Sequence, residues 1–175
     1  MRVMDPIECG RWCASRQVAF DDKRNIIVDA TTERRFKICL PESGLDIARM
    51  GLALSRDQSG FEHSRFLLWL TECGMWNQAM EALGSRLWDR LIQGNLGKQT
   101  AGEVVACLFD GDEMYDKAAC LTTIMLFQWD AILVPDHGEY AVQIDHDGYI
   151  ALKARIGTAS ERAIEDLAKE EVPQS

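Results

Sequence analysis

The sequence predicts an α+β fold, in which a largely antiparallel or mixed β-sheet carries three to four helices packed mainly on one face. Some short segments alternate apolar and polar side chains, as half-buried strands do, whereas longer ones repeat apolar residues every three or four positions, as helices do. The two kinds follow one another in mixed order without a linker or repeat. Residues 1–175 are therefore expected to form a single domain, with 1–16 and 171–175 loosely ordered.

The first forty residues are expected to be rich in strands. Residues 17–20 and 25–30 are short apolar runs on either side of a polar turn, which predicts a hairpin. Residues 35–40 alternate in polarity until Pro41, which removes a backbone donor and ends the strand.

A helix is expected to begin after Ser43, whose side chain can cap it, and to end at the break over residues 57–60. The continuous apolar run at 66–70 predicts a central strand. An amphipathic helix follows, and the stripe expected to face the core consists of Met80, Leu83, Leu87 and Leu91.

The C-terminal part of the chain predicts a further strand, a buried helix, three short strands and a final helix. The first strand covers 104–109, and Asp112 is placed to cap the helix after it. Apolar residues at 131–134, 140–144 and 149–152 predict the three short strands, joined by tight turns.

The net charge of the chain is −9, and its acidic residues are unevenly placed. Residues 103–152 contain ten acidic residues and one basic residue, Lys117. A field of this sign repels phosphates, so we expect no nucleic acid as a partner, and it favours encounter with a basic protein surface. Solubility alone is the alternative explanation of the same charge.

The chain begins without a recognisable export signal and has no apolar run of membrane-spanning length, so we expect a cytoplasmic protein that does not enter a membrane. Its six cysteines are then expected to be reduced. Cys9 and Cys13 form the one close pair. Without a second pair at zinc spacing we expect no metal or other cofactor there, and the choice between ligands and free thiols stays open.

Histidines and carboxylates gather in two loops, as Asp136-His137 and as Asp145-His146-Asp147. Such groups could bind a divalent metal that activates water. The strand between them would hold the histidines about 25 Å apart, which argues against a shared site, and ordinary turn chemistry is the alternative. A metal-dependent hydrolase that uses His137 or His146 with nearby carboxylates is therefore the second hypothesis.

Motifs of nucleophilic catalysis are missing from the sequence. No serine lies in a nucleophile elbow, and a cysteine nucleophile would need Cys13 or Cys73 beside His63 without a supporting local motif. We therefore expect no catalytic residue.

Two tryptophans are candidate anchors for a protein partner. Trp69 and Trp129 are expected in the core, whereas partial exposure and core filling are equal alternatives for Trp76 and Trp88. Exposed indoles beside carboxylates form the anchor and rim that dominate protein interfaces.

Three segments resemble a set of small uncharacterised bacterial proteins: 66–76 (FLLWLTECGMW), 127–130 (FQWD) and 144–147 (IDHD). In that set a strand ending L-T-E-W-G is followed by a helix, then by G-W-D and S-H-D-E. The resemblance covers residues 61–150 and implies a bacterial cytoplasmic origin, but no activity, because none is established for that set. The chain departs from the pattern at Cys73, Gln128, Asp145 and Gly148.

These observations favour a non-catalytic acidic module that binds a basic protein, with a homodimer as a further possibility. One concrete form is an immunity-type protein that neutralises a toxin by covering its cationic active site, because charge complementarity gives fast association. The residues expected to contact the partner are Trp76, Trp88, Asp110, Asp112, Glu113, Asp116, Asp136, Glu139, Asp145 and Asp147.

Overall fold

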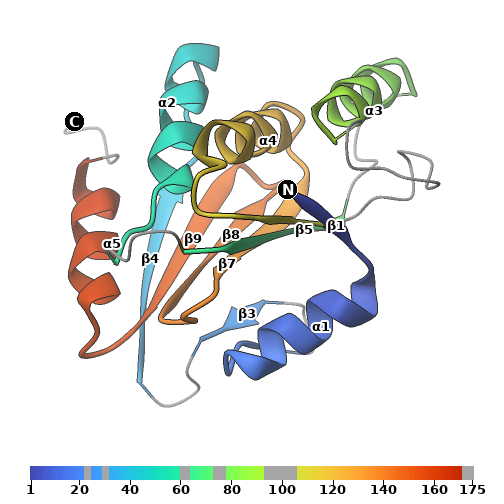
Figure 1. The fold of residues 1–175 in the computed structure, drawn as a ribbon. Coiled ribbons are helices and arrows are strands. Elements are labelled where there is room, and N and C mark those ends of the chain that lie inside the picture. The colour runs from blue at the N-terminus through green and yellow to red at the C-terminus, as the bar shows by residue number, and fades with distance from the viewer. Residues whose placement is uncertain (22–24, 29–31, 60–63, 73–77, 93–105, 171–175) are drawn as a thin grey trace.

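A seven-stranded antiparallel sheet forms the centre of the molecule, as Figure 1 shows for the computed structural model. The structure describes residues 1–21, 25–28, 32–59, 64–72, 78–92 and 106–170. The strands follow the order β1-β6-β5-β7-β8-β9-β4. They are β1 (Arg2–Met4), β4 (Glu33–Cys39), β5 (Phe66–Glu72), β6 (Ala106–Phe109), β7 (Asp130–Pro135), β8 (Tyr140–Asp145) and β9 (Tyr149–Arg155).

Helices and a small hairpin complete the described chain, and the predicted α+β fold is confirmed. The hairpin pairs β2 (Ala19–Phe20) with β3 (Ile26–Ile27). The helices are α1 (Pro6–Ser15), α2 (Gly44–Ser55), α3 (Gln78–Ile92), α4 (Met114–Leu126) and α5 (Ala159–Glu170). Among the described helices, none combines the length and the apolar character needed to cross a bilayer.

Strand β5 explains why both faces of the sheet are covered. Phe66, Leu68 and Leu70 point to the face packed by α2, α3, α4 and α5, where the larger apolar core lies. Leu67 and Trp69 alternate with them and join a second core on the opposite face. Such a strand is apolar on both sides, which produces the continuous run seen in the sequence.

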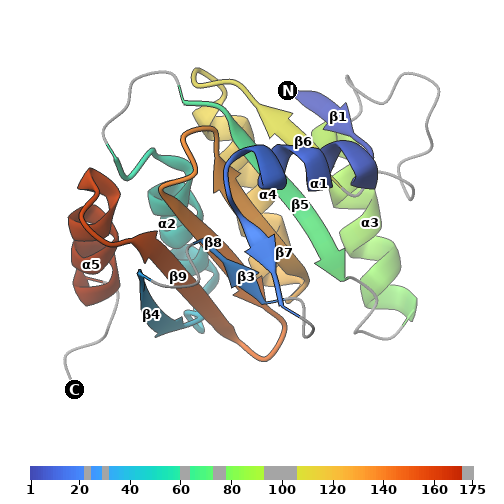
Figure 2. The same ribbon diagram turned by 90° about the horizontal axis from the view of Figure 1, so that it is seen from below.

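Helix α1 and the β2–β3 hairpin cover that second face (Figure 2). The helix was not among the expected elements, although its start carries a clear signal. Asp5 accepts a hydrogen bond from the Glu8 backbone and Glu8 returns one to the Asp5 backbone, with Pro6 in the first turn. Its residues Cys9, Trp12 and Cys13 are buried against the second core.

The core-facing stripe predicted for α3 is wrong. Met80, Leu83 and Leu87 are exposed and Leu91 is half-buried, whereas Gly84, Trp88 and Ile92 face the core. Gly84 allows this orientation, because a Cβ there would lie 2.7 Å from the Trp129 ring. The two stripes lie side by side on the helix and have the same spacing in the sequence, so the spacing alone does not show which of them is buried.

The helix cap predicted at Asp112 is also wrong. Glu113 is the N-cap residue of α4 and makes no side-chain cap bond. Its carboxylate instead accepts a hydrogen bond from the backbone N–H of Asp110 at 2.8 Å and pairs with the amine of Met1. Ser43, in contrast, caps α2 as predicted, through the backbone N–H of Asp46.

Candidate functional site

The acidic residues of the 103–152 stretch that the structure describes lie at two opposite ends of the sheet. Strand pairing brings Phe66, Phe109 and Pro135 together at one end, so that Asp110 and Asp136, which follow two of them, lie there. Strand β8 carries the chain to the opposite end, where Asp145 and Asp147 lie with Asp130. The stretch therefore does not form one continuous surface.

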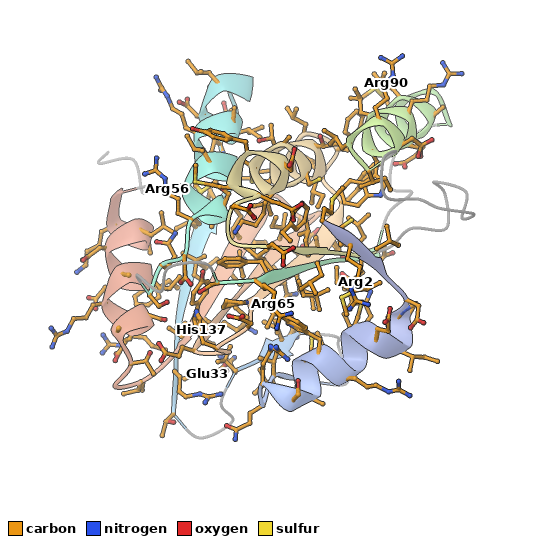
Figure 3. The ribbon with its side chains drawn as sticks, viewed as in Figure 1. Arg2, Glu33, Arg56, Arg65, Arg90 and His137 are labelled. Atoms are coloured by element: carbon orange, nitrogen blue, oxygen red, sulfur yellow. The ribbon has the colours of Figure 1, made fainter. Side chains whose placement is uncertain are left out.

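Three of the predicted contact residues at the first end have structural partners. Asp136 lies 3.6 Å from the guanidinium of Arg65. Glu139 accepts a hydrogen bond from the Ser160 hydroxyl at 2.8 Å, and Glu113 holds the Met1 amine. Arg65 and His137 also lie at this end (Figure 3). Pairing of this kind reduces the charge that these carboxylates offer to another molecule.

The junction of β6 and α4 keeps three exposed carboxylates, on Asp110, Asp112 and Asp116. The described part of the chain supplies no cation within ion-pair distance of any of them. Between them lies Tyr115, whose side chain is 75% exposed. We call this group the acidic junction.

Of the two tryptophans proposed as anchors, the structure describes Trp88, which is buried. Trp88 is 3% exposed and packs edge-on against Trp129, with ring centroids 6.4 Å apart. The expectation that Trp88 is partly exposed is wrong, because Gly84 brings this side of α3 onto the Trp129 ring. Trp76 lies outside the described residues, as do Cys73 and His63.

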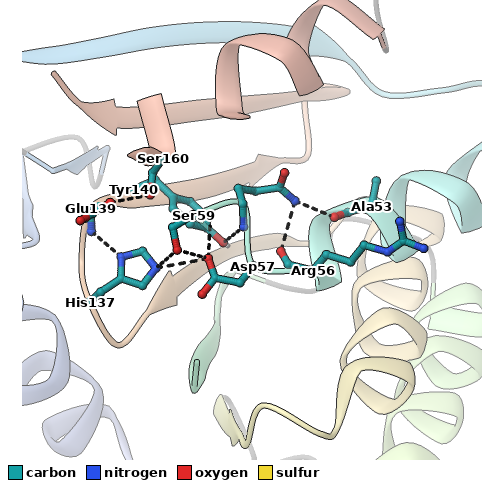
Figure 4. Close-up of polar contacts among 9 residues, drawn as sticks. Ala53, Arg56, Asp57, Ser59, His137, Glu139, Tyr140 and Ser160 are labelled. Atoms are coloured by element: carbon teal, nitrogen blue, oxygen red, sulfur yellow. Dashed lines mark hydrogen bonds and ion pairs between the residues drawn. The ribbon is translucent and has the colours of Figure 1, made fainter. Parts of the chain in front are cut away.

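His137 forms a polar cluster with the segment that follows α2 (Figure 4). Its Nε2 lies 3.2 Å from the Ser59 hydroxyl and 3.4 Å from Asp57 Oδ1, while the Glu139 backbone N–H donates to Nδ1 at 3.1 Å. Because Nδ1 accepts, the neutral ring carries its proton on Nε2. A ring in this tautomer donates to Ser59 or Asp57 and does not act as a base toward the serine.

The polar cluster continues into the core. Burial alone would raise the pKa of Asp57, but hydrogen bonds from His137, Ser59 and Ser64 outweigh it and lower the pKa to about 2. Behind it, Lys117 on α4 is buried and its ammonium lies 3.2 Å over the Phe66 ring. Burial lowers the pKa of Lys117 to about 7, although Asp57 acts in the opposite direction. The cluster thus joins α2, α4 and the β7–β8 turn.

His146 lies at the other end of β8, so the two histidines do not share a site, as predicted. Its Nδ1 lies 2.9 Å and 3.0 Å from the two oxygens of Asp130, and its backbone N–H donates to the same carboxylate at 2.6 Å. The hydrogen bond with Asp130 raises the pKa of His146. Ligand atoms of Asp130, Asp145 and His146 lie within 4.8 Å of one another.

Cys9 and Cys13 are free thiols buried beneath α1. Burial raises the pKa of Cys9 to about 12 and that of Cys13 to about 11. Both thiols therefore keep their protons at neutral pH.

Comparisons with protein-family models, with curated proteins and with solved structures found no significant match. The arguments on function therefore start from the geometry of the chain itself.

Sequence reasoning missed Asp57, Lys117, Tyr115 and Asp130 as members of these clusters. Asp130 had a usable signal, because it directly precedes a strand whose neighbour ends in Asp145-His146. Tyr115 also had a local signal, because it lies within five residues of Asp110, Asp112 and Asp116. Asp57 and Lys117 have partners far away in the chain, so no local pattern indicates them.

Proposed function

We propose that the protein is a non-catalytic module that binds a basic protein surface through the acidic junction. The observation that carries the proposal is the exposed Tyr115 ring among the exposed carboxylates of Asp110, Asp112 and Asp116. An amphipathic aromatic side chain anchors an interface, and surrounding charges steer and orient the partner. A toxin with a cationic active site is one partner of this chemistry.

The geometry of the junction supports a docking role over a purely solvating one. Glu113 is held by the Met1 amine and by the Asp110 backbone, so the turn before α4 is tied to β1 and β6. A partner would therefore meet carboxylates whose backbone is already ordered, which lowers the entropy cost of binding.

The test compares two triple variants of the full chain, each of which removes three negative charges. In the first, Asp110→Asn, Asp112→Asn and Asp116→Asn remove the junction charge; in the control, Glu42→Gln, Glu72→Gln and Asp166→Asn remove three exposed carboxylates elsewhere. Partner captured from the native host is then titrated against each by surface plasmon resonance at low and high salt. We expect the first triple to slow association about tenfold or more at low salt, with little effect of the control.

Tyr115→Ala is expected to speed dissociation without changing the salt dependence of association. Equal weakening by both triple variants, or association rates that do not respond to salt, would contradict the proposal, because bulk charge or another surface would then explain binding.

A divalent metal centre at Asp130, Asp145 and His146 is a second candidate function. It is favoured by the convergence of three potential ligand atoms within 4.8 Å. The described parts of the segments that resemble the bacterial proteins also meet here, because Glu72 pairs with Asp130 and Asp130 binds His146. An imidazole with two carboxylates leaves coordination positions for water, as a metal-dependent hydrolase requires.

Zinc titration by calorimetry tests this candidate with two matched variants. His146→Gln is expected to abolish stoichiometric binding, whereas His137→Gln, the same change at the opposite end of β8, should preserve it. The candidate fails if the unaltered protein takes up no zinc, or if both variants bind equally.

A further inference from the structure

A hollow of about 290 Å³ lies between the β2–β3 hairpin and the β8-β9-β4 edge of the sheet. Its floor is Ala151 of β9, whose small side chain leaves space between larger neighbours. Strand pairing sets Lys37 on one side of Ala151 and Gln143 on the other, with Tyr149 and Lys153 two residues away along β9. All of these side chains therefore share the face of the sheet that the hairpin partly covers.

The lining of this hollow is basic, in contrast to the chain as a whole. Arg35, Lys37 and Lys153 contribute three cations. Arg35 pairs with Glu33, but no carboxylate in the described ranges lies within ion-pair distance of either lysine. The Lys37 ammonium instead lies 3.5 Å from the centre of the Tyr149 ring.

Lys153 is the most informative of the three cations, because it is 5% exposed. Its ammonium donates one hydrogen bond, to the backbone carbonyl of Ile26 in the hairpin. Gln143 accepts from the backbone N–H of the same residue at 3.2 Å, which leaves its amide N–H groups to donate elsewhere. Burial lowers the pKa of Lys153, although the charges of Glu33 and Asp21 act in the opposite direction. An anion in the hollow would offset more of this desolvation cost.

We propose that this hollow binds the phosphate group of a small molecule, with Arg35, Lys37, Lys153 and the Gln143 amide as donors. Several N–H donors and three positive charges suit a polyvalent oxyanion better than a single carboxylate. The volume admits a small ligand. An extended polyanion is disfavoured, because Asp145 and Asp147 lie at the same end of β8 and β9. This inference does not depend on either proposed function.

Calorimetric titration of the full chain with pyrophosphate and with glycerol 3-phosphate, at low ionic strength, tests the inference. We expect saturable binding of one molecule per chain, and the stronger of the two probes shows whether the site prefers a diphosphate or a phosphate monoester. Arg35→Gln and Lys37→Gln should each weaken the association constant about tenfold, since each removes a charged donor.

These variants and a control distinguish binding at the hollow from a general effect of positive charge on anion binding. Arg35 and Lys37 are exposed, so their loss should leave the melting temperature close to that of the parent. Lys169→Gln removes an exposed lysine from α5 and should leave binding unchanged. Absence of saturable binding for both probes, or equal weakening by Lys169→Gln, overturns the inference. A shift of the Lys153 ammonium resonance on pyrophosphate addition, which needs about tenfold more pyrophosphate in Lys37→Gln, supports it.

Discussion

Lys117 shows how one residue shapes the stability of this fold. Its ammonium is buried over the Phe66 ring, and Asp57 is the nearby charge that favours its protonated form. Because the pKa of Lys117 is about 7 in the folded protein against 10.5 as the ordinary value, the unfolded chain binds its proton more tightly. The resulting penalty on folding is complete below pH 7 and disappears as the pH rises toward 10.5.

Lys117→Met is therefore expected to stabilise the protein at pH 6, by about 1–4 kcal/mol, because an apolar chain of similar length replaces a buried charge. The difference in the free energy of unfolding between this variant and the parent should become smaller as the pH rises from 7 to 10. Urea unfolding at several pH values measures it. Lys169→Met, on the surface of α5, is the control and should change little at any pH. If the stability gained by Lys117→Met did not vary with pH, removal of the buried charge would not be the cause of that gain.

His146 gives a second prediction at this scale. Because the Asp130 hydrogen bond is the largest cause of its raised pKa, Asp130→Asn should return the titration midpoint of His146 toward the ordinary 6.5. The bond stabilises the fold fully at pH values below 6.5. This stabilisation disappears as the pH rises through the pKa that His146 has in the folded protein. Proton NMR of the imidazole in chelator-treated protein measures the midpoint. Asp147→Asn should lower it less, and an equal effect of the two variants would contradict the assignment.

At the scale of elements, α2 and α4 form the closest helix pair, and one glycine permits their approach. A Cβ on Gly51 would lie 2.4 Å from Thr122 Oγ1 and 3.1 Å from the Ala118 carbonyl oxygen. Gly44, in the first turn of the same helix, has nothing within 4 Å of that position. The two glycines thus have different roles although both lie in α2.

Gly51→Ala is expected to destabilise the protein by about 1–3 kcal/mol, because overpacking outweighs the higher helix propensity of alanine. Gly44→Ala is the matched control and should be neutral or slightly stabilising. Thermal and urea unfolding compare the two variants. If Gly51→Ala were as stable as Gly44→Ala, the tight crossing of α2 and α4 would not be required.

At the scale of the whole molecule, the two edges of the sheet are protected in different ways. Strand β4 carries charged side chains along its length, which disfavour pairing with another chain. Strand β6 consists of four buried residues and is covered by the short strand β1. Strand β1 also supplies the Met1 amine that holds Glu113.

Removal of residues 1–4 is accordingly expected to promote association, because it exposes the unpaired backbone and apolar side chains of β6. Light scattering after size exclusion would detect the larger species. Arg2→Ala, which removes an exposed ion pair with Glu8 and keeps the strand, should stay in the state of the parent. A truncated chain in that same state would show that β1 does not protect the edge.

The amino-acid sequence by itself determined the α+β class, the positions of most strands and the start of α2 at Ser43. These features depend on interactions within a few residues, such as polarity period and capping, which a linear pattern contains. The helix α1 could have been predicted on the same basis from Asp5, Pro6 and Glu8.

Tertiary structure alone decided which side chains meet. His137 reaches Asp57 across 80 positions of the chain, and His146 reaches Asp130 across 16. Strand order likewise divided the acidic stretch between two ends of the sheet, and the Gly84 contact selected the face of α3 that is buried. Register and close packing between distant segments determine these outcomes, and no local period encodes them.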